Sequence, residues 1–130
     1  MFDGLAVGLT GILERVVEEQ HCTVRGDIAV FSTPSMVSLL EEAADETMRP
    51  YLGADQDSVG VRVDVRHLAA TPKGMRVRAT ATVREIDRRR VTFDVVIEDE
   101  VEKVGEATHD RFIIDGERYT ERLKQKASKG

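Results

Sequence analysis

The chain has 130 residues, of which 41% are hydrophobic, and this length and composition suit one globular domain over residues 1–130. Its 24 acidic and 19 basic side chains give a net charge of −5 without a concentrated basic face, so a nucleic-acid partner is not expected. The only cysteine, Cys22, cannot form an internal disulfide, and no Cys/His cluster has metal-ligand spacing, so neither a metal nor another cofactor is expected.

The N-terminal part of the chain shows no targeting segment. Residues 1–20 lack the basic start and long apolar run of a secretory signal, and no stretch elsewhere approaches the roughly 20 apolar residues of a membrane helix. We therefore expect a cytoplasmic protein with no membrane partner. The stretch LTGILERVVEEQHCTV (9–24) mixes strand-forming valines with helix formers, and we interpret it as a first strand followed by an irregular segment.

A long helix is predicted to start at Thr33 and Pro34, because a threonine hydroxyl can accept an orphan N–H and proline lacks a donor that the first turn leaves unpaired. Pro50 and Gly53 mark its far end. Glu41 lies at the edge of the apolar stripe, where a carboxylate either reaches water or belongs to a functional site. The stripe comprises Met36, Val37, Leu40, Ala43, Ala44, Thr47 and Met48, and the opposite face comprises Glu42, Asp45, Glu46 and Arg49.

After this helix the hydrophobic period changes from helical to alternating. His67 shares the apolar face of the next strand with Val61, Val63 and Val65. A single inward histidine is more often a core residue than a catalytic one, so the residues alone leave both roles open. The four strands predicted in this half cover residues 59–68, 75–86, 90–100 and 103–115, and a short terminal helix follows at 116–126.

The order of predicted elements indicates an α+β hotdog fold. In this fold a curled antiparallel sheet wraps around one long central helix, and the domain pairs as a dimer, because one helix covers only one face of such a sheet. Thr33 at the helix start, Glu41 two turns later and His67 on an inward strand form a possible catalytic constellation. The helix N-terminus adds backbone N–H groups that suit a developing oxyanion.

Three segments carry a resemblance to a known family: VFSTPSMVSLLEEA, RPYLGADQDSVGVRVDVRHLAATPKGMRVRATATV and GEATHDRFIID. Together they resemble the fluoroacetyl-CoA thioesterase-like family of hotdog proteins over about residues 20–126. The resemblance implies a homodimer with active sites near the subunit interface, and an acyl-CoA thioesterase that releases free acid and coenzyme A. It implies catalytic roles for Thr33, Glu41 and His67, a place for Gly60 beside the reacting carbonyl, and a supporting role for Arg111.

One residue and one segment qualify this resemblance. His109 shares a motif with Arg111, yet we interpret it as structural, next to the small residues Gly105 and Ala107. The segment HCTVRGDIAVF has no aromatic residue before Phe31, whereas the family member selective for fluoroacetyl-CoA has phenylalanines there. The expected substrate is therefore a short or small acyl-CoA in general.

Two other functions remain open at this point. One is a non-catalytic acyl-CoA-binding hotdog protein, and the other is a hotdog enoyl-CoA hydratase, whose histidine is commonly joined by Asp or Asn in a motif that is not evident here. The sequence also leaves open the identity of the acyl group and whether its carrier is coenzyme A or a carrier protein. It does not distinguish an anhydride route from a general-base route, and it does not show whether the assembly goes beyond a dimer.

Overall fold

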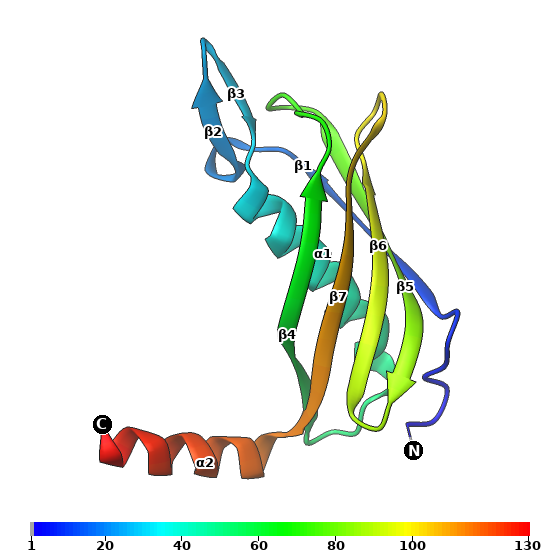
Figure 1. The fold of residues 1–130 in the computed structure, drawn as a ribbon, viewed down its shortest axis with the longest axis vertical. Helices are drawn as coiled ribbons and strands as arrows, with labels where there is room; N and C mark the ends of the chain where they lie inside the picture. Colours follow the sequence, from blue (N-terminus) through cyan, green and yellow to red (C-terminus); the bar gives the residue numbers. More distant parts are fainter. Residues whose placement is uncertain (1) are drawn as a thin grey trace.

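The structure is a computed structural model that describes residues 2–130 (Figure 1). The chain begins with a strand and a 3-10 turn, forms a small hairpin, enters its long helix and then runs through four long strands to a terminal helix. In chain order the elements are β1 (Thr10–Val16), η1 (Glu19–His21), β2 (Cys22–Arg25), β3 (Ile28–Phe31), α1 (Thr33–Met48), η2 (Arg49–Tyr51), β4 (Gln56–His67), β5 (Arg76–Asp87), β6 (Arg90–Glu98), β7 (Lys103–Asp115) and α2 (Gly116–Lys129).

Five strands form one sheet in the order β1-β5-β6-β7-β4, and every neighbouring pair is antiparallel. β5, β6 and β7 follow one another as hairpins, while β4 pairs with the far side of β7 and β1 with the far side of β5. The sheet curls around α1, which lies along its concave face (Figure 1). This arrangement confirms the predicted α+β hotdog fold and leaves β1 and β4 as the two edge strands.

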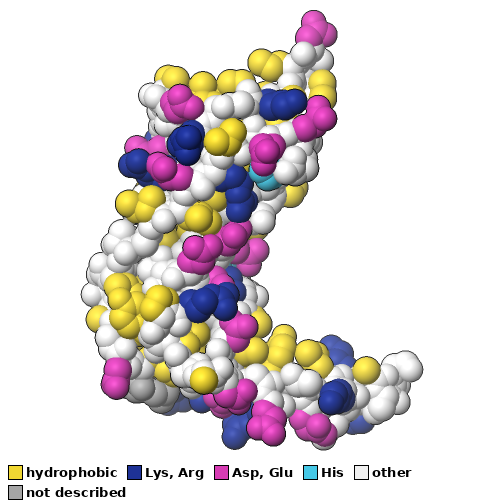
Figure 2. All heavy atoms as spheres, turned by 180° about the vertical axis from the view of Figure 1, so that it is seen from behind, with side chains coloured by type: hydrophobic (Ala, Val, Ile, Leu, Met, Phe, Trp, Pro, Cys, Tyr) yellow, Lys and Arg dark blue, Asp and Glu magenta, His cyan; other side chains and the backbone are white. Residues whose placement is uncertain are grey.

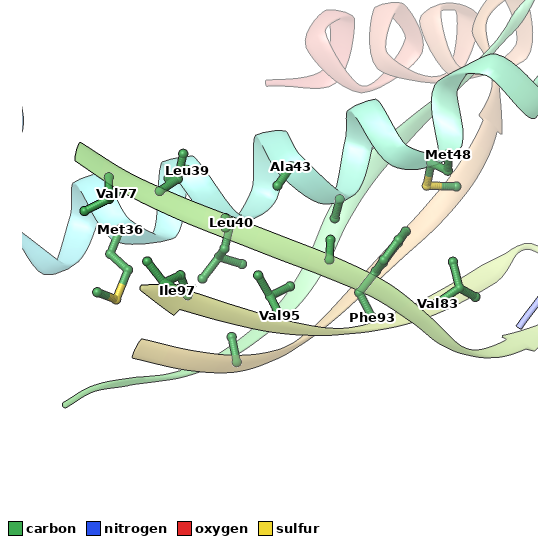
Figure 3. Close-up of a cluster of buried hydrophobic side chains, with 14 of the residues drawn as sticks. Met36, Leu39, Leu40, Ala43, Met48, Val77, Val83, Phe93, Val95 and Ile97 are labelled. Atoms are coloured by element: carbon green, nitrogen blue, oxygen red, sulfur yellow. The ribbon is translucent and has the colours of Figure 1, made fainter. Parts of the chain in front are cut away.

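The hydrophobic core lies between α1 and the concave face of the sheet (Figure 3). Alternating residues of β5 and β6 point toward the helix, as their sequence period predicted. Gly105 on β7 confirms the expected close approach of a bulky neighbour, because a Cβ there would lie 2.6 Å from the sulfur of Met36. The core side chains labelled in Figure 3 are Met36, Leu39, Leu40, Ala43, Met48, Val77, Val83, Phe93, Val95 and Ile97.

The start and the buried face of α1 differ in detail from the prediction. Ser32 is the N-cap, since its side chain accepts a hydrogen bond from the Ser35 N–H at 3.2 Å, and Thr33 is the first helical residue. The prediction of Thr33 as the cap was wrong, and its hydroxyl is free for another partner. Leu39 is buried while Val37 is only half-buried, because β1 and β5 curl around that side of the helix.

Strand β4 contains a bulge that the alternating sequence did not reveal. The pairing with β7 shifts register between Gly60 and Arg62, so the residue between them has no single partner. Val61 is consequently 57% exposed, and the prediction that it faces inward with Val63 and Val65 was wrong. The bulge allows Ser58 and Gly60 to face α1 on one side of it and His67 on the other.

The segment expected to be irregular contains the hairpin of β2 and β3. Cys22 pairs with Phe31 and Arg25 with Ile28, which leaves a two-residue turn of Gly26 and Asp27. Gly26 has a φ of +62°, a conformation that favours glycine. The hairpin stands apart from the main sheet and leads directly into α1 (Figure 1).

Helix α2 extends away from the sheet at its β4 edge (Figure 1). It runs to Lys129, three residues beyond the predicted end, and none of its residues is buried. Within residues 2–130, no helix combines the length and the apolar character needed to cross a membrane.

Candidate active site

Thr33 and His67 form the first part of the candidate site. The Thr33 hydroxyl, on the first residue of α1, lies 2.9 Å from Nδ1 of His67 at the end of β4. The Phe31 ring packs edge-on against His67, with ring centroids 6.5 Å apart and an interplanar angle of 68°. The imidazole is therefore held between a hydroxyl and an aromatic ring, and its other nitrogen is left for a further partner.

An open cavity of about 430 Å³ lies beside this pair. The β2–β3 hairpin contributes Thr23 and Arg25 to its wall, and the connection after β4 contributes Leu68. The hairpin therefore forms one wall of the cavity beside Thr33 and His67.

Glu41 forms the second part of the site. Its Oε2 atom lies 3.7 Å from Nη1 of Arg111 and 4.0 Å from Nε2 of His109, and its side chain is 38% exposed. Gly60 faces it from β4. A Cβ at Gly60 would overlap the Glu41 carboxylate and lie 3.4 Å from Arg111, so only glycine leaves the carboxylate in its present place.

Arg111 is fixed by a buried network. Its Nε donates to the Ser58 hydroxyl at 2.8 Å and its Nη2 to the Ser58 carbonyl at 3.0 Å. The Ser58 hydroxyl in turn donates to Oδ1 of Asp45 at 2.7 Å. Burial lowers the pKa of the Arg111 guanidinium, whereas Asp45 and Glu41 oppose that shift, and the group stays charged. Arg111 therefore lies between two carboxylates on adjacent turns of α1, and the exposed Arg49 also pairs with Asp45.

His109 is fully buried beside this network. Its Nδ1 lies 2.7 Å from the backbone carbonyl of Arg62, which makes this nitrogen the N–H donor. Its Nε2 can then accept from Nη1 of Arg111 at 3.2 Å. Burial lowers the pKa of His109, and the nearby Arg111 charge acts in the same direction. The buried position agrees with a structural role, although its polar neighbours are Arg111 and Glu41.

The pKa of His109 predicts how stability responds to acid. Below about pH 6.5 an unfolded histidine binds a proton, whereas His109 in the folded state stays neutral to lower pH. The unfolded state then binds more protons, so the free energy of unfolding should fall as the pH drops through this window, despite the opposing charges of Glu41 and Asp110. Urea unfolding at pH 7.5 and 5.5 should show a smaller loss in His109→Gln than in the wild type. Equal losses in both proteins would contradict a neutral His109.

The two parts of the site are separate within one chain. Thr33 and Glu41 are eight residues apart on α1, which is about 12 Å along the helix axis. Gly60 and His67 lie roughly 20 Å apart along β4. In residues 2–130 Glu41 makes no hydrogen bond or ion pair with His67, so the expected contact between carboxylate and imidazole is not formed inside a single chain.

Sequence reasoning missed Asp45 and Ser58. We assigned Asp45 to the solvent face of α1, but its side chain is only 15% exposed and accepts the Ser58 hydrogen bond. The spacing did indicate the position of Asp45, because this residue follows Glu41 by four residues and must lie on the same side of the helix. Ser58 precedes Gly60 by two residues on a strand, and so shares its face.

The fold and the paired polar clusters on α1 and β4 place the chain in the hotdog class of proteins. A solved structure of the fluoroacetyl-CoA thioesterase FlK superposes with a TM-score of 0.88 and 32% identity, covering 95% of this chain and 98% of that one. A thioesterase superfamily member from Thermus thermophilus gives a TM-score of 0.86 at 25% identity, covering 98% and 99%.

Sequence comparison identifies the family within this class. The fluoroacetyl-CoA thioesterase of Streptantibioticus cattleyicolor is 39% identical over 101 residues, which cover 78% of this chain and 73% of that protein. The family model described as fluoroacetyl-CoA-specific thioesterase matches residues 14–117. The chain belongs to this family, which confirms the resemblance inferred from its motifs.

Proposed function

We propose that this protein is an acyl-CoA thioesterase that hydrolyses a short or small acyl-CoA to the free acid and coenzyme A. The family and its named relatives support thioester hydrolysis. The observation that carries the proposal is the Glu41 carboxylate, which is partly exposed and lies beside the charged Arg111 and opposite the bare backbone of Gly60. The absence of a side chain at Gly60 is what lets the carboxylate lie against this strand.

Glu41 is the group that we propose acts on the thioester. As a general base it would take a proton from water while the water oxygen bonds to the carbonyl carbon. As a nucleophile it would bond to that carbon itself, expel the thiolate and leave an anhydride that water then opens. Both routes end with the same acid and thiol, and in both the Glu41 carboxylate acts from its place 3.7 Å from Nη1 of Arg111.

We propose further that the protein works as a homodimer joined through β4. This edge strand is 12 residues long, and its outer side carries no partner strand in the described chain, residues 2–130. Val61 and Leu68 expose apolar side chains along and just beyond it. Long edge strands with apolar surface pair readily with other strands, and a twofold axis would join two copies of β4 antiparallel in one continuous sheet.

This dimer would bring the two parts of the site together. In a pairing register that sets Gly60 opposite His67 of the second copy, Glu41 of one copy approaches the Thr33–His67 pair of the other. Each of two identical sites would then contain Glu41, Gly60 and Arg111 from one copy and Thr33 and His67 from its mate. The separation of the clusters within one chain supports such a shared site.

In the shared site His67 would assist the leaving group. Its Nδ1 is engaged by Thr33, so Nε2 is the nitrogen left to face the substrate and donate a proton to the departing thiolate. Thr33 lies at the N-terminus of α1, where unpaired backbone N–H groups favour negative charge on the carbonyl oxygen.

The hairpin supports a small acyl group without fluoroacetyl selectivity. Phe31 is the only aromatic residue of the hairpin, and its ring is already packed against His67. Thr23, Arg25 and Val30 line the rest of the cavity wall on this side. A wall of this composition has no further aromatic ring to surround a fluoromethyl group.

Thiol release from a panel of short, branched and aromatic acyl-CoA thioesters tests the proposed activity. Release well above the spontaneous rate, with a clear preference within the panel, is the expected result. Loss of conjugated absorbance from an enoyl-CoA without thiol release would instead indicate a hydratase. Binding of acyl-CoA with neither reaction would indicate a non-catalytic binding protein.

Gly60→Ala is expected to lower kcat/KM for the best thioester by about 10- to 100-fold, because the new methyl group displaces the Glu41 carboxylate. Gly53→Ala is a matched control, since a Cβ there would meet only the flexible Gln56 side chain, at 3.3 Å. Both rates come from the thiol assay on proteins whose thermal unfolding is also recorded. Equal activity of the two variants would contradict the proposed role of Gly60 in the site.

A further inference from the structure

Helix α2 has an apolar side on which no residue is buried within the described residues 2–130. Tyr119, Leu123 and Ala127 follow one another at intervals of four residues and form a stripe. Tyr119 is 38% exposed and Leu123 48% exposed. A helix of 14 residues is marginal on its own in water and is normally held by packing of such a stripe. The helix therefore needs a surface that lies outside the single chain.

The direction of α2 indicates where that surface lies. The helix leaves the end of β7, passes the start of β4 and continues beyond the β4 edge of the sheet (Figure 1). Apolar side chains lie along the side of α2 that faces the hollow between this helix and the rest of the molecule (Figure 2). The stripe thus faces the space in which a second copy paired through β4 would lie.

The charge of α2 is opposite to that of the remaining chain. The helix carries two acidic residues, Glu117 and Glu121, whereas the whole protein has a net charge of −5. A basic helix beside an otherwise acidic body is electrostatically suited to contact another copy of that body. Its five basic residues are Arg118, Arg122, Lys124, Lys126 and Lys129.

We infer that α2 is a dimer arm that packs on a second copy of this chain, across the end of its sheet formed by residues 68–75 and 99–102. The inference rests on the β4 pairing of the proposed function. Gly116 at the start of α2 donates to the carbonyl of Asp55, one residue before β4, at 2.7 Å. In the register that sets Gly60 opposite His67, Asp55 lies level with residue 72 of the second copy.

The receiving surface has the matching properties. Its two connections are joined by the hydrogen bond from the Thr71 hydroxyl to Asp99 at 2.9 Å, so they form one surface. Leu68 and Val101 expose 51% and 76% of their area there, and acidic residues flank Val101 in the sequence. The apolar and acidic groups complement the apolar stripe and the basic flanks of α2. The acidic residues are Asp99, Glu100 and Glu102, and Lys73 is the one basic residue of the two connections.

A membrane surface is a weaker partner for this helix. Amphipathic helices that bind bilayers bury a broad face of large apolar side chains. The stripe of α2 has one tyrosine, one leucine and one alanine, and polar side chains fill the rest of its circumference. Such a narrow stripe suits packing against one complementary protein surface.

Sedimentation velocity over a range of concentrations tests the arm. Leu123→Asp and Val101→Asp are each expected to raise the dimer dissociation constant at least tenfold, since each would place an unpaired carboxylate in the same interface. Val7→Asp is the control, because Val7 is 65% exposed in the segment before β1, at the opposite edge of the sheet. Hydrogen exchange of α2 amides should be slow in the dimer and fast in the Leu123→Asp monomer.

The outcomes separate the arm from the activity. If Leu123→Asp leaves the dimer dissociation constant unchanged, the proposal that α2 is a dimer arm is overturned, even if the protein hydrolyses thioesters. A dimer weakened by both substitutions supports the arm, even if no thioester is cleaved. The protein is also tested for binding to mixed phosphatidylcholine and phosphatidylserine vesicles. If Leu123→Asp abolishes such binding and leaves the dimer unchanged, α2 is a membrane-binding helix and the dimer-arm proposal is overturned.

Discussion

Glu41→Gln is expected to lower kcat/KM for thioester hydrolysis by about 10³-fold, which corresponds to roughly 4 kcal/mol of transition-state stabilisation. The amide keeps the shape of the side chain and can still accept a hydrogen bond, but it is neither a base nor a nucleophile. Glu41 lies at the surface of the core beside Arg111 and Gly60, so the substitution leaves the packing of α1 unchanged. Thiol release under kcat/KM conditions measures the loss.

Glu42→Gln provides the matched control for this experiment. Glu42 is the next residue of α1, and its carboxylate pairs with Arg15 on β1 at 2.5 Å, away from Gly60. Its removal should change the rate less than about threefold, because an exposed pair contributes little to stability and none to the site. A Glu41→Gln enzyme as active as Glu42→Gln would contradict the catalytic role of Glu41.

Arg111→Met is expected to lower the free energy of unfolding by about 3–5 kcal/mol, as measured by urea denaturation at pH 7.5. The Arg111 side chain is 9% exposed and donates twice to Ser58, within 4 Å of Asp45 and Glu41. Methionine fills a similar volume, yet it leaves the partly buried carboxylate of Asp45 with only the exposed Arg49 as a cation. Hydrolysis should also fall, because Glu41 loses the cation that holds it in place.

Arg84→Met separates the effect of burial from that of charge. Arg84 pairs with Asp94 at 2.9 Å, but both side chains are about half exposed, so this variant should lose less than about 1 kcal/mol. Arg111→Lys should recover only part of the stability, since an ammonium cannot reproduce the forked contacts of guanidinium. An Arg111→Met protein as stable as Arg84→Met would show that the network is not needed for folding.

The sequence predicted the helices and strands of this protein well wherever the hydrophobic residues follow a regular helical or alternating period. The alternation in β5 and β6, the apolar stripe of α1 and the small Gly105 on β7 each follow from one face being buried. Thr33, Glu41 and His67 were all found as candidates. Their separation into two clusters within one chain was not predicted, because it depends on how a helix crosses a strand in three dimensions.

The missed features depend on local geometry that a period does not encode. Ser32 and Thr33 are both good caps, and only the backbone decides between them. The bulge at Val61 reverses one side chain without altering the alternating letters. The buried link from Asp45 to Ser58 joins two elements whose relative placement no single-sequence pattern reports. The Gly26–Asp27 turn could have been predicted from the sequence, since two such residues between short strands favour a hairpin.

A mixing experiment tests the central claim most directly. Glu41→Gln and His67→Ala variants are purified separately, unfolded together in equal amounts, refolded and assayed for thiol release. In a site shared between copies, a mixed dimer has one site with both substitutions and one site with neither. Statistical pairing makes half of the dimers mixed, so about a quarter of the wild-type activity should return.

The same mixture also defines the contrary result. Each variant refolded alone should remain inactive, and the wild type treated in the same way sets the reference. Recovery near a quarter of that reference would show that Glu41 of one copy and His67 of the other act on one thioester. A mixture as inactive as its components, with the refolded wild type fully active, would contradict a site shared across the dimer.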